Sequence, residues 1–337
     1  MPTLLGLAAL AMVLAATPAA KPAARDPNAL LRTSPQVLVD PQAYYSPALF
    51  REKGPPQPGE WMKEHPEPVQ TFQEFTASKP VRPTVGRHTI VLSPVGKMTD
   101  KERARLDVLR EFMEIYYTLP VRIGPPLALE GVKFRDRTLL GNPVRQYLAD
   151  DILYRVLKPA LPADAACLIG TTMDDLYPEE AWNYVFGQAT IAQRVGIYSL
   201  RRLYPAFWNK AETPEAEHLG MVRGLLLLVH ETGHMFGVEH CQKYACAMNG
   251  TNSLRESDAQ PIHLCPDCLK KCRWGLGFDI TTRYEALRKF YAAHAMPAEA
   301  EWVAKRIAQC RGEKMPAPAA IPAPARAATP AAVPAAK

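Results

Sequence analysis

Three histidines in the segment VHETGHMFGVEH stand at spacings that suit a single metal ion. His230 and His234 are four residues apart, so on a helix both side chains project from one face, a turn apart. Gly237 lets the chain leave the helix, and His240 can then swing back as a third ligand. Three neutral imidazoles with an open fourth position are the pattern of catalytic zinc. The segment therefore predicts a catalytic zinc bound by His230, His234 and His240, and not histidines that merely lie near a helix end.

Glu231 lies between the first two predicted ligands and is not needed as a ligand itself. Zinc lowers the pKa of a bound water to about 7 and polarises a carbonyl oxygen, which allows attack on an amide at neutral pH. We expect Glu231 to take the proton from that zinc-bound water and to deliver it to the leaving amine. The predicted reaction is peptide-bond hydrolysis without a covalent enzyme intermediate.

Four cysteines form a second group next to the histidines. Cys241 and Cys246 flank the letters QKYA, and Cys265 and Cys268 enclose PD. A CxxC joined to another close pair is what a closed tetrahedral zinc site requires, and such sites stabilise folds. Two disulfides, or one disulfide with spare thiols, are the alternative that an exported protein would permit. The remaining cysteines are Cys167, which we expect to be a buried apolar side chain, and the unassigned Cys272 and Cys310.

Hydrophobic periodicity predicts the elements that must position these residues. The predicted strands span residues 87–96, 119–129, 164–176, 183–190 and 194–202. The predicted helices span residues 100–118, 145–161, 214–237, 281–295 and 298–310, and a loop-rich segment runs from 249 to about 271. This alternation favours an α/β (α+β) fold, a mixed twisted sheet with helices packed on it. Helix 214–237 carries the first half of the histidine motif, and its end near Gly237 separates an upper subdomain from a lower one.

The two ends of the chain differ in composition from its middle. The chain has 337 residues and 33 prolines, which concentrate before about residue 83 and after residue 314. Proline-rich sequence of this kind does not form a compact apolar interior, so the folded part is predicted to run from about His88 to Gly312. We divide the chain into residues 1–20, a signal peptide; 21–84, a Pro-rich N-terminal extension; 85–312, the catalytic domain, with subdomains to about 237 and 238–312; and 313–337, a Pro/Ala-rich disordered tail.

The start of the chain predicts export. Residues 4–16 form an uninterrupted apolar run that is followed by small residues, as in a secretory signal, and the run is too short to span a bilayer. The protein is then expected to be secreted or periplasmic, without a membrane anchor after cleavage. An Ala-rich start of a cytoplasmic protein is the alternative. The net charge is +6, and the Lys and Arg residues are interspersed with acidic residues instead of forming runs. This distribution gives no support to a nucleic-acid partner.

The motif residues together resemble those of one family, the archaemetzincins of the metzincin clan of metalloproteases. The family signature, HExxHxxGxxHCxxxxCxM followed by a distal CxxC, is matched by His230, Glu231, His234, Gly237, His240, Cys241, Cys246, Met248, Cys265 and Cys268. Segments such as LFREKGPPQPGEWMKEHPEPVQTFQEF, DLYPEEAWNYVFGQAT and GFDITTRYEALRKFY resemble animal-type members, so the similarity covers roughly residues 49–291.

The resemblance implies a metzincin-like catalytic domain with an active-site helix and a Cys-rich, zinc-bearing C-terminal subdomain. It implies two zinc ions per chain, a catalytic ion on the three histidines and a structural ion on Cys241, Cys246, Cys265 and Cys268. Met248 would be the Met-turn residue, an apolar floor beneath the imidazoles. Such folds also carry an antiparallel edge strand above the cleft, for which NYVFGQAT (183–190) is the candidate.

These features predict a zinc peptidase, a monomer that acts on peptides or small proteins, as an endopeptidase or as an aminopeptidase. A competing hypothesis from another class is a non-catalytic, zinc-stabilised module that binds peptides without cutting them. Glu231 discriminates between the two, because a site that only bound peptide would have no chemical need for a base beside the metal.

Overall fold

The computed structural model describes residues 42–313. The predicted signal peptide at residues 1–20 and nearly all of the predicted tail lie outside the described residues, as does the extension before residue 42. Within 42–313 no helix is both long enough and apolar enough to cross a membrane.

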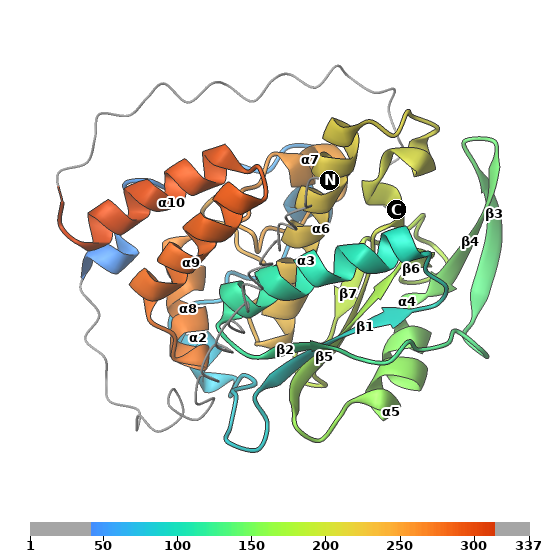
Figure 1. Cartoon of the computed structure of the whole chain (residues 1–337), viewed down its shortest axis with the longest axis horizontal. Helices are drawn as coiled ribbons and strands as arrows, with labels where there is room; N and C mark the ends of the chain where they lie inside the picture. Colours follow the sequence, from blue (N-terminus) through green and yellow to red (C-terminus); the bar gives the residue numbers. More distant parts are fainter. Residues whose placement is uncertain (1–41, 314–337) are drawn as a thin grey trace, which may run out of the picture.

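The described chain alternates strands and helices (Figure 1). The strands are β1 (Thr89–Val95), β2 (Val121–Ile123), β3 (Phe134–Leu139), β4 (Asn142–Leu148), β5 (Ala165–Thr172), β6 (Asp175–Tyr177), β7 (Gly187–Ala189) and β8 (Val195–Ser199). The α-helices are α1 (Trp61–Glu64), α2 (Phe72–Ala77), α3 (Asp100–Tyr117), α4 (Ala149–Asp151), α5 (Lys158–Ala160), α6 (Pro214–Met235), α7 (Leu254–Asp258), α8 (Pro266–Leu276), α9 (Ile280–Ala293) and α10 (Pro297–Cys310). Short helices of other types are η1 (Gln42–Tyr45), the π-helix η2 (Ile152–Leu157), η3 (Arg201–Leu203) and η4 (Pro205–Trp208).

The central sheet has five strands in the order β2-β1-β5-β8-β7. The first four strands are parallel, and β7 pairs with β8 in the antiparallel direction. β7 is therefore an antiparallel edge strand, which leaves one row of its backbone groups unpaired within the sheet. The predicted mixed α/β fold is confirmed.

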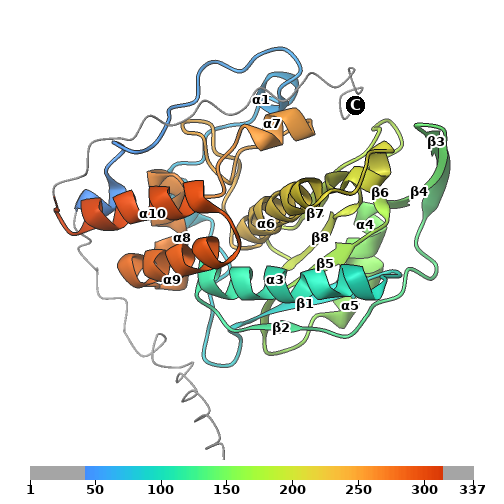
Figure 2. The ribbon, with the colours of Figure 1, turned by 45° about the horizontal axis from the view of Figure 1, so that its top comes forward.

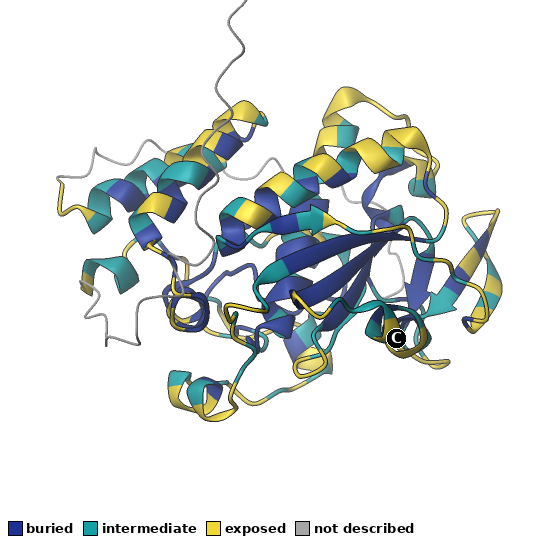
Figure 3. Ribbon diagram, turned by 60° about the horizontal axis from the view of Figure 1, so that its bottom comes forward, coloured by how far each residue is buried: buried dark blue, intermediate teal, exposed yellow. Residues whose placement is uncertain are grey.

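Both faces of the sheet are covered by helices, and β1 and β5 are accordingly rich in apolar residues and buried on both sides. Ile90 and Leu92 of β1 face the core formed with α3 and α6, and Val91 and Val95 face the core formed with η2. Figure 2 shows α3 and α6 together on one face of the sheet, and Figure 3 colours the central strands as buried and the outer sides of the helices as exposed. This two-sided burial makes the sheet a rigid support for α6.

The predicted helix at residues 145–161 begins too early. Residues 145–148 belong to β4, which forms a hairpin with β3 and a small sheet with β6. The hairpin turn places Leu140 and Gly141 at positive φ, and β3 alternates between exposed and partly buried residues. Too few apolar residues mark this hairpin for hydrophobic periodicity to have found it.

The folded part begins well before His88, so the prediction that it starts there is wrong. Although residues 42–84 are rich in proline, they place Phe50, Met62 and Phe75 in buried positions against the rest of the chain. A capping box at Thr71 and Glu74 starts α2, and Phe75 of this helix lies against Trp274 of α8. Few apolar side chains are enough here because the folded chain supplies the opposing surface.

The segment after Met248 is more helical than predicted. It contains α7, and α8 begins at Pro266, within the segment expected to be a loop up to Lys271. Pro at the first position of α8 and a Cys265 side chain that accepts a hydrogen bond from the backbone of Cys268 account for the start of this helix. The predicted C-terminal helices are present as α9 and α10.

Candidate metal centres

α6 presents the first two predicted zinc ligands near its C-terminal end. Thr213 caps the helix and Pro214 occupies its first turn, which starts α6 well before the motif. His230 and His234 consequently lie inside a regular helix, and their ring centroids are 4.6 Å apart. The helix gives both side chains one direction, as the i, i+4 spacing requires.

A tight turn after α6 brings in His240. Gly237 has a φ of +85°, and a Cβ added there would lie 2.6 Å from Cβ of Pro80. The position therefore requires glycine both for its backbone conformation and for the close approach of Pro80. The rings of His234 and His240 are then 4.8 Å apart, so the structure brings together the three histidines, which we call the histidine cluster.

The hydrogen bonds of the three rings orient them toward one point. Nδ1 of His230 lies 2.9 Å from the carbonyl oxygen of Ala247, and Nδ1 of His234 lies 2.7 Å from that of Val238. Nδ1 of His240 lies 2.9 Å from each carboxylate oxygen of Glu67. Carbonyl and ionised carboxylate oxygens only accept, so each Nδ1 carries the proton and donates. In a neutral ring the other nitrogen, Nε2, is then an acceptor.

The arrangement of these Nε2 atoms fits a cation. Nε2 of His230 and Nε2 of His234 face each other at 3.0 Å, although in these tautomers neither has a proton to share. Burial lowers the pKa of His230 to about 3 and also lowers the pKa of His234, which keeps both rings neutral at neutral pH. Facing lone pairs on neutral imidazoles are a donor set suited to zinc.

Glu231 is buried, with 5% of its surface exposed, on the same turn of α6 as the histidines. Its carboxyl group packs against β7: a Cβ added at Gly187 would lie 2.7 Å from its Cδ. Burial raises the pKa of Glu231 to about 8. A dication on the adjacent rings would favour the ionised form of this carboxylate.

Met248 lies fully buried beneath the turn of α6 between the two helix-borne histidines. A Cβ added at Gly233 would lie 2.9 Å from Cε of Met248, so the thioether packs directly against the helix backbone. The Met248 carbonyl accepts a hydrogen bond from the backbone of Cys241 at 2.7 Å. This contact ties the segment carrying Met248 to the residue that follows His240.

A cleft of about 270 Å³ opens onto the histidine cluster. β7 forms one side, and Trp61, Trp182 and Leu227 contribute apolar surface. The Phe186 carbonyl accepts from Ser199, and Thr190 donates to Val195, so in an antiparallel ladder the intervening Gly187 and Ala189 direct their backbone groups away from β8. Apart from the histidines, Glu231 is the only ionisable side chain in the lining within the described chain.

The four cysteines with zinc-site spacing also come together, and we call them the cysteine cluster: Cys241, Cys246, Cys265 and Cys268. All four are buried, and their sulfur atoms lie within 4.8 Å of one another. Sγ of Cys241 and Sγ of Cys265 are 3.6 Å apart. Sulfurs bound to one tetrahedral zinc at about 2.3 Å lie about 3.8 Å apart, whereas a disulfide needs about 2.05 Å.

Backbone groups around the cysteine cluster suit thiolates. Sγ of Cys246 accepts from the backbone nitrogens of Cys265 at 3.2 Å and Met248 at 3.5 Å. Sγ of Cys265 accepts from the nitrogen of Cys268 at 3.4 Å, at the start of α8, where the helix dipole favours negative charge. Hydrogen bonds with the other three cysteines lower the pKa of Cys241.

The other cysteines stay outside this cluster. All described cysteines are free; Cys167 is buried in β5 as expected, Cys272 is buried in α8, and Cys310 at the end of α10 is partly exposed. Asn249 is buried, and its side chain donates hydrogen bonds to the carbonyls of Cys241 and Tyr244. The Asn249 side chain therefore stabilises the loop that carries Cys241 and Cys246.

Residues of the N-terminal extension also reach the site, and sequence reasoning missed them. Glu67 accepts from His240 Nδ1 and from Nε1 of Trp61, the latter at 2.7 Å. The Trp61 ring lies 5.4 Å from that of His240, and the His65 ring stacks on Trp182 and also contacts Trp61. The only signal in the sequence was the resemblance of the segment GEWMKEHPEPVQ to animal-type archaemetzincins, which assigns no role to a residue.

Comparison with known proteins matches this sequence to a family of peptidases. The sequence model of peptidase family M54 matches residues 163–273, a range that contains both clusters. Archaemetzincin-2 from Macaca fascicularis is 34% identical over 258 residues, which cover 68% of this chain and 71% of the relative. Human archaemetzincin-1 is 31% identical over 255 residues, 68% of this chain and 51% of the relative.

Similar solved structures carry the same family name. The crystal structure of an archaemetzincin from Methanopyrus kandleri shares 26% sequence identity, covers 58% of this chain and 99% of its own, and gives a TM-score of 0.44.

Proposed function

The chain belongs to the archaemetzincins, peptidase family M54, and is a zinc metallopeptidase; from that premise we propose that the histidine cluster holds the catalytic zinc and that Glu231 is the general base. The observation that carries the proposal is that one ring nitrogen of each of the three histidines lies within 4.8 Å of the others, beside the buried carboxylate of Glu231 in the cleft. Zinc bound there supplies Lewis acidity toward the substrate carbonyl and acidifies a coordinated water.

Side chains and backbone carbonyls of the protein carry out the other parts of the proposed mechanism. Glu231 receives the proton of the attacking water on its carboxylate and returns it to the leaving nitrogen, and its contact with Gly187 fixes where that carboxylate can lie. The carbonyls of Ala247 and Val238 hold the two helix-borne rings in the tautomer that presents Nε2 to the metal. Met248 packs beneath them and keeps the floor of the site apolar.

β7 supports binding of the substrate as an extended strand. Its outward backbone groups at Gly187 and Ala189 can pair with a peptide, which would lie along the cleft past the histidines. Trp61, Trp182 and Leu227 line this path, so uncharged or apolar side chains next to the cleaved bond are favoured. The substrates are accordingly peptides or small proteins.

A non-catalytic peptide-binding module is less well supported, because the buried carboxylate against Gly187 costs desolvation energy that peptide binding alone does not need. Incubation of the full chain with a diverse peptide pool decides between the two. Cleavage that a chelator abolishes and added zinc restores is expected. Zinc-replete protein that binds the peptides and releases them uncut would establish the binding module.

The cysteine cluster is proposed to hold a second, structural zinc, which would give two ions per chain. Its burial, the sulfur spacing and the backbone donors to sulfur support this assignment. Elemental analysis of freshly purified protein should give about two zinc per chain. A content of about one, with Cys265 recovered in a disulfide by mass spectrometry, would replace the structural zinc with a disulfide.

Export is proposed from the apolar run at residues 4–16, and zinc on the cysteine cluster would protect its thiols in an oxidising compartment. The protein is proposed to act as a monomer without a membrane anchor. N-terminal sequencing of protein from the producing cell tests export: a mature start near residue 20 is expected, and an intact Met1 in cytosolic protein would contradict it.

A further inference from the structure

The segment from Trp61 to Pro80, which we call the N-terminal strap, lies across the turn that carries His240. Gln70 donates from Nε2 to the carbonyl of Gly237 at 3.0 Å and accepts at Oε1 from the backbone of Glu239 at 3.2 Å. Lys271 of α8 donates to the Gln70 carbonyl at 2.6 Å. The middle of the strap is thus fixed to both sides of the turn between His234 and His240.

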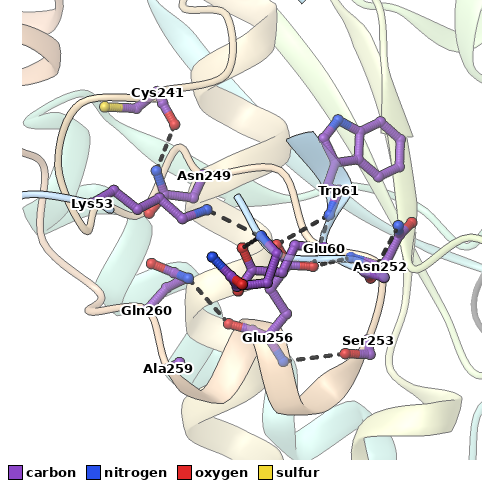
Figure 4. A network of polar contacts seen from close by, with 12 residues as sticks. Lys53, Glu60, Trp61, Cys241, Asn249, Asn252, Ser253, Glu256, Ala259 and Gln260 are labelled. Carbon is purple, nitrogen blue, oxygen red and sulfur yellow. Dashed lines mark hydrogen bonds and ion pairs between the residues drawn. The ribbon is translucent and has the colours of Figure 1, made fainter. Parts of the chain in front are cut away.

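The start of the strap is fixed to a different part of the chain. Figure 4 shows the Glu256 carboxylate of α7 directed at the backbone nitrogen of Trp61, at 3.2 Å. The same carboxylate accepts from the backbone of Asn252 at 2.7 Å, so it joins the strap to the loop after Met248. Glu256 is buried, with 7% of its surface exposed, which marks this junction as an interior contact and not a surface one.

Glu67 lies between these two anchors, and both its carboxylate and its backbone carbonyl accept hydrogen bonds. Its two carboxylate oxygens lie 2.9 Å from Nδ1 of His240, and one of them accepts from the Trp61 indole. Its backbone carbonyl accepts from Nε2 of Gln242 at 2.8 Å. The strap therefore holds the Glu67 side chain at the ring of His240 from both ends.

We propose that Glu67 is a positioning residue for the catalytic zinc, and that the N-terminal strap is consequently a working part of the metal centre. The inference rests on the proposed function, since it assumes that His240 is a ligand. His230 and His234 stand on a helix, and backbone carbonyls that follow in the chain orient them. His240 stands beyond the helix and takes its orientation from a side chain 173 residues away.

The position of the carboxylate distinguishes support from inhibition. A segment that blocked the enzyme would occupy the open position of the metal, whereas Glu67 contacts Nδ1 of His240 and leaves its Nε2 free of this contact. A carboxylate at this nitrogen fixes the tautomer, aligns the ring and strengthens Nε2 as a donor. The strap therefore supports zinc binding and leaves the cleft open.

The test measures zinc affinity directly, on the full chain, by competition with a chelator of known affinity. Glu67→Ala should weaken binding at the histidine cluster by about 10–100-fold, the range typical of lost hydrogen-bond partners of metal ligands. Glu67→Gln keeps an oxygen acceptor without the charge and should fall between Glu67→Ala and the wild type. Zinc at the cysteine cluster should be unchanged in both variants, and their thermal unfolding checks that they fold.

Glu52→Ala is the matched control, because it removes an exposed carboxylate that lies before the strap and leaves the Glu67 carboxylate and the strap contacts in place. Its zinc affinity should stay within about threefold of the wild type, well below the effect expected for Glu67→Ala. Equal losses in Glu52→Ala and Glu67→Ala would show that the loss does not depend on the carboxylate at His240 and would overturn its role. Wild-type affinity in Glu67→Ala would overturn it too.

The outcome separates this inference from the proposed function. Affinity that depends on Glu67 in a protein that cleaves no peptide would retain the positioning role and remove the peptidase mechanism. Peptide cleavage that continues in Glu67→Ala with unchanged zinc affinity would do the reverse.

Discussion

The histidine cluster and the cysteine cluster share one short stretch of chain, yet their surroundings differ. The histidines are partly exposed and open onto a cleft, and they offer three ligand atoms. The cysteines are buried and offer four. Cys241 directly follows His240, and the Met248 carbonyl accepts a hydrogen bond from the Cys241 backbone. The two clusters are therefore connected directly through the backbone.

This difference in burial and ligand number suits the two clusters to different roles, although one stretch of chain carries both. A closed site with four protein ligands has no room for substrate and stabilises the fold, whereas a site with three ligands keeps a position for chemistry. The proposed zinc on the cysteine cluster would fix the loop that passes beneath α6, and this loop would form the floor of the proposed catalytic site. Experiments that remove one site at a time should therefore give different losses.

Stepwise removal of metal should give the largest effect. The histidine cluster faces the cleft and should lose its zinc first, with complete loss of activity and a small change in melting temperature. The buried cysteine cluster should keep its ion until the chain unfolds. Zinc content and activity measured together during dialysis against a chelator check this. Simultaneous loss of both ions, or activity that persists after the first ion is lost, would contradict this difference between the two clusters.

Glu231→Gln should lower kcat by about 10²–10⁴-fold, the range supplied by a general base, and leave zinc content unchanged. Because burial already disfavours the charged Glu231 carboxylate, the neutral amide should not reduce thermal stability. Steady-state kinetics, elemental analysis and thermal unfolding measure the three quantities. Glu215→Gln, in the first turn of the same helix, is the control and should match the wild type. Wild-type turnover in Glu231→Gln would refute the mechanism.

Cys265→Ser should cost stability and activity together, in contrast to Glu231→Gln. Loss of a metal ligand should lower the free energy of unfolding by about 4 kcal/mol or more and release the loop that carries Met248. Denaturant unfolding followed alongside peptide cleavage tests this. Cys310→Ser, at a partly exposed cysteine outside the cluster, should change stability by less than about 1 kcal/mol. A Cys265→Ser protein that stays stable and active would show that the two sites are independent.

Gly187→Ala should give the smallest of these effects and isolate the placement of the base. The added methyl would press on the Glu231 carboxyl group without touching a metal ligand, and a displacement of this size can lower kcat by up to about 100-fold. Zinc affinity should be unaffected. Gly54→Ala, where an added Cβ meets nothing within 4 Å, is the control. Kinetics that show no change in kcat would mean that β7 does not position Glu231.

The contacts within each cluster follow from local spacing, which is why sequence predicted where these residues meet. His230 and His234 are related by helix geometry, and Gly237 and the cysteine pairs by short turns. Glu67 and Trp61 have no such relation, because their partner His240 lies far along the chain and only the tertiary fold brings them together. Proline content also misled the prediction for residues 42–84, since that segment folds by packing on a surface made by others.

The strands of the sheet show the same limit of prediction from sequence. Buried parallel strands such as β1 and β5 are rich in apolar residues and could be predicted from the sequence, whereas the β3–β4 hairpin depends on polar pairs. Arg145 and Asp136 face each other across it at 2.8 Å. The edge position of β7 follows from strand order, which periodicity does not give.

The N-terminal strap has a consequence for how the chain is made. During synthesis the strap is among the first described residues to emerge, yet its partners Gly237 and His240 follow more than 160 residues later. Contacts of such long sequence separation form late in folding, because the intervening chain must first be ordered. Phe75 therefore remains exposed until α8 is complete, and the third imidazole gains its carboxylate partner only at the end. Metal loading is then expected to coincide with the final folding step, so the nascent chain would stay inactive until its first and last thirds have met.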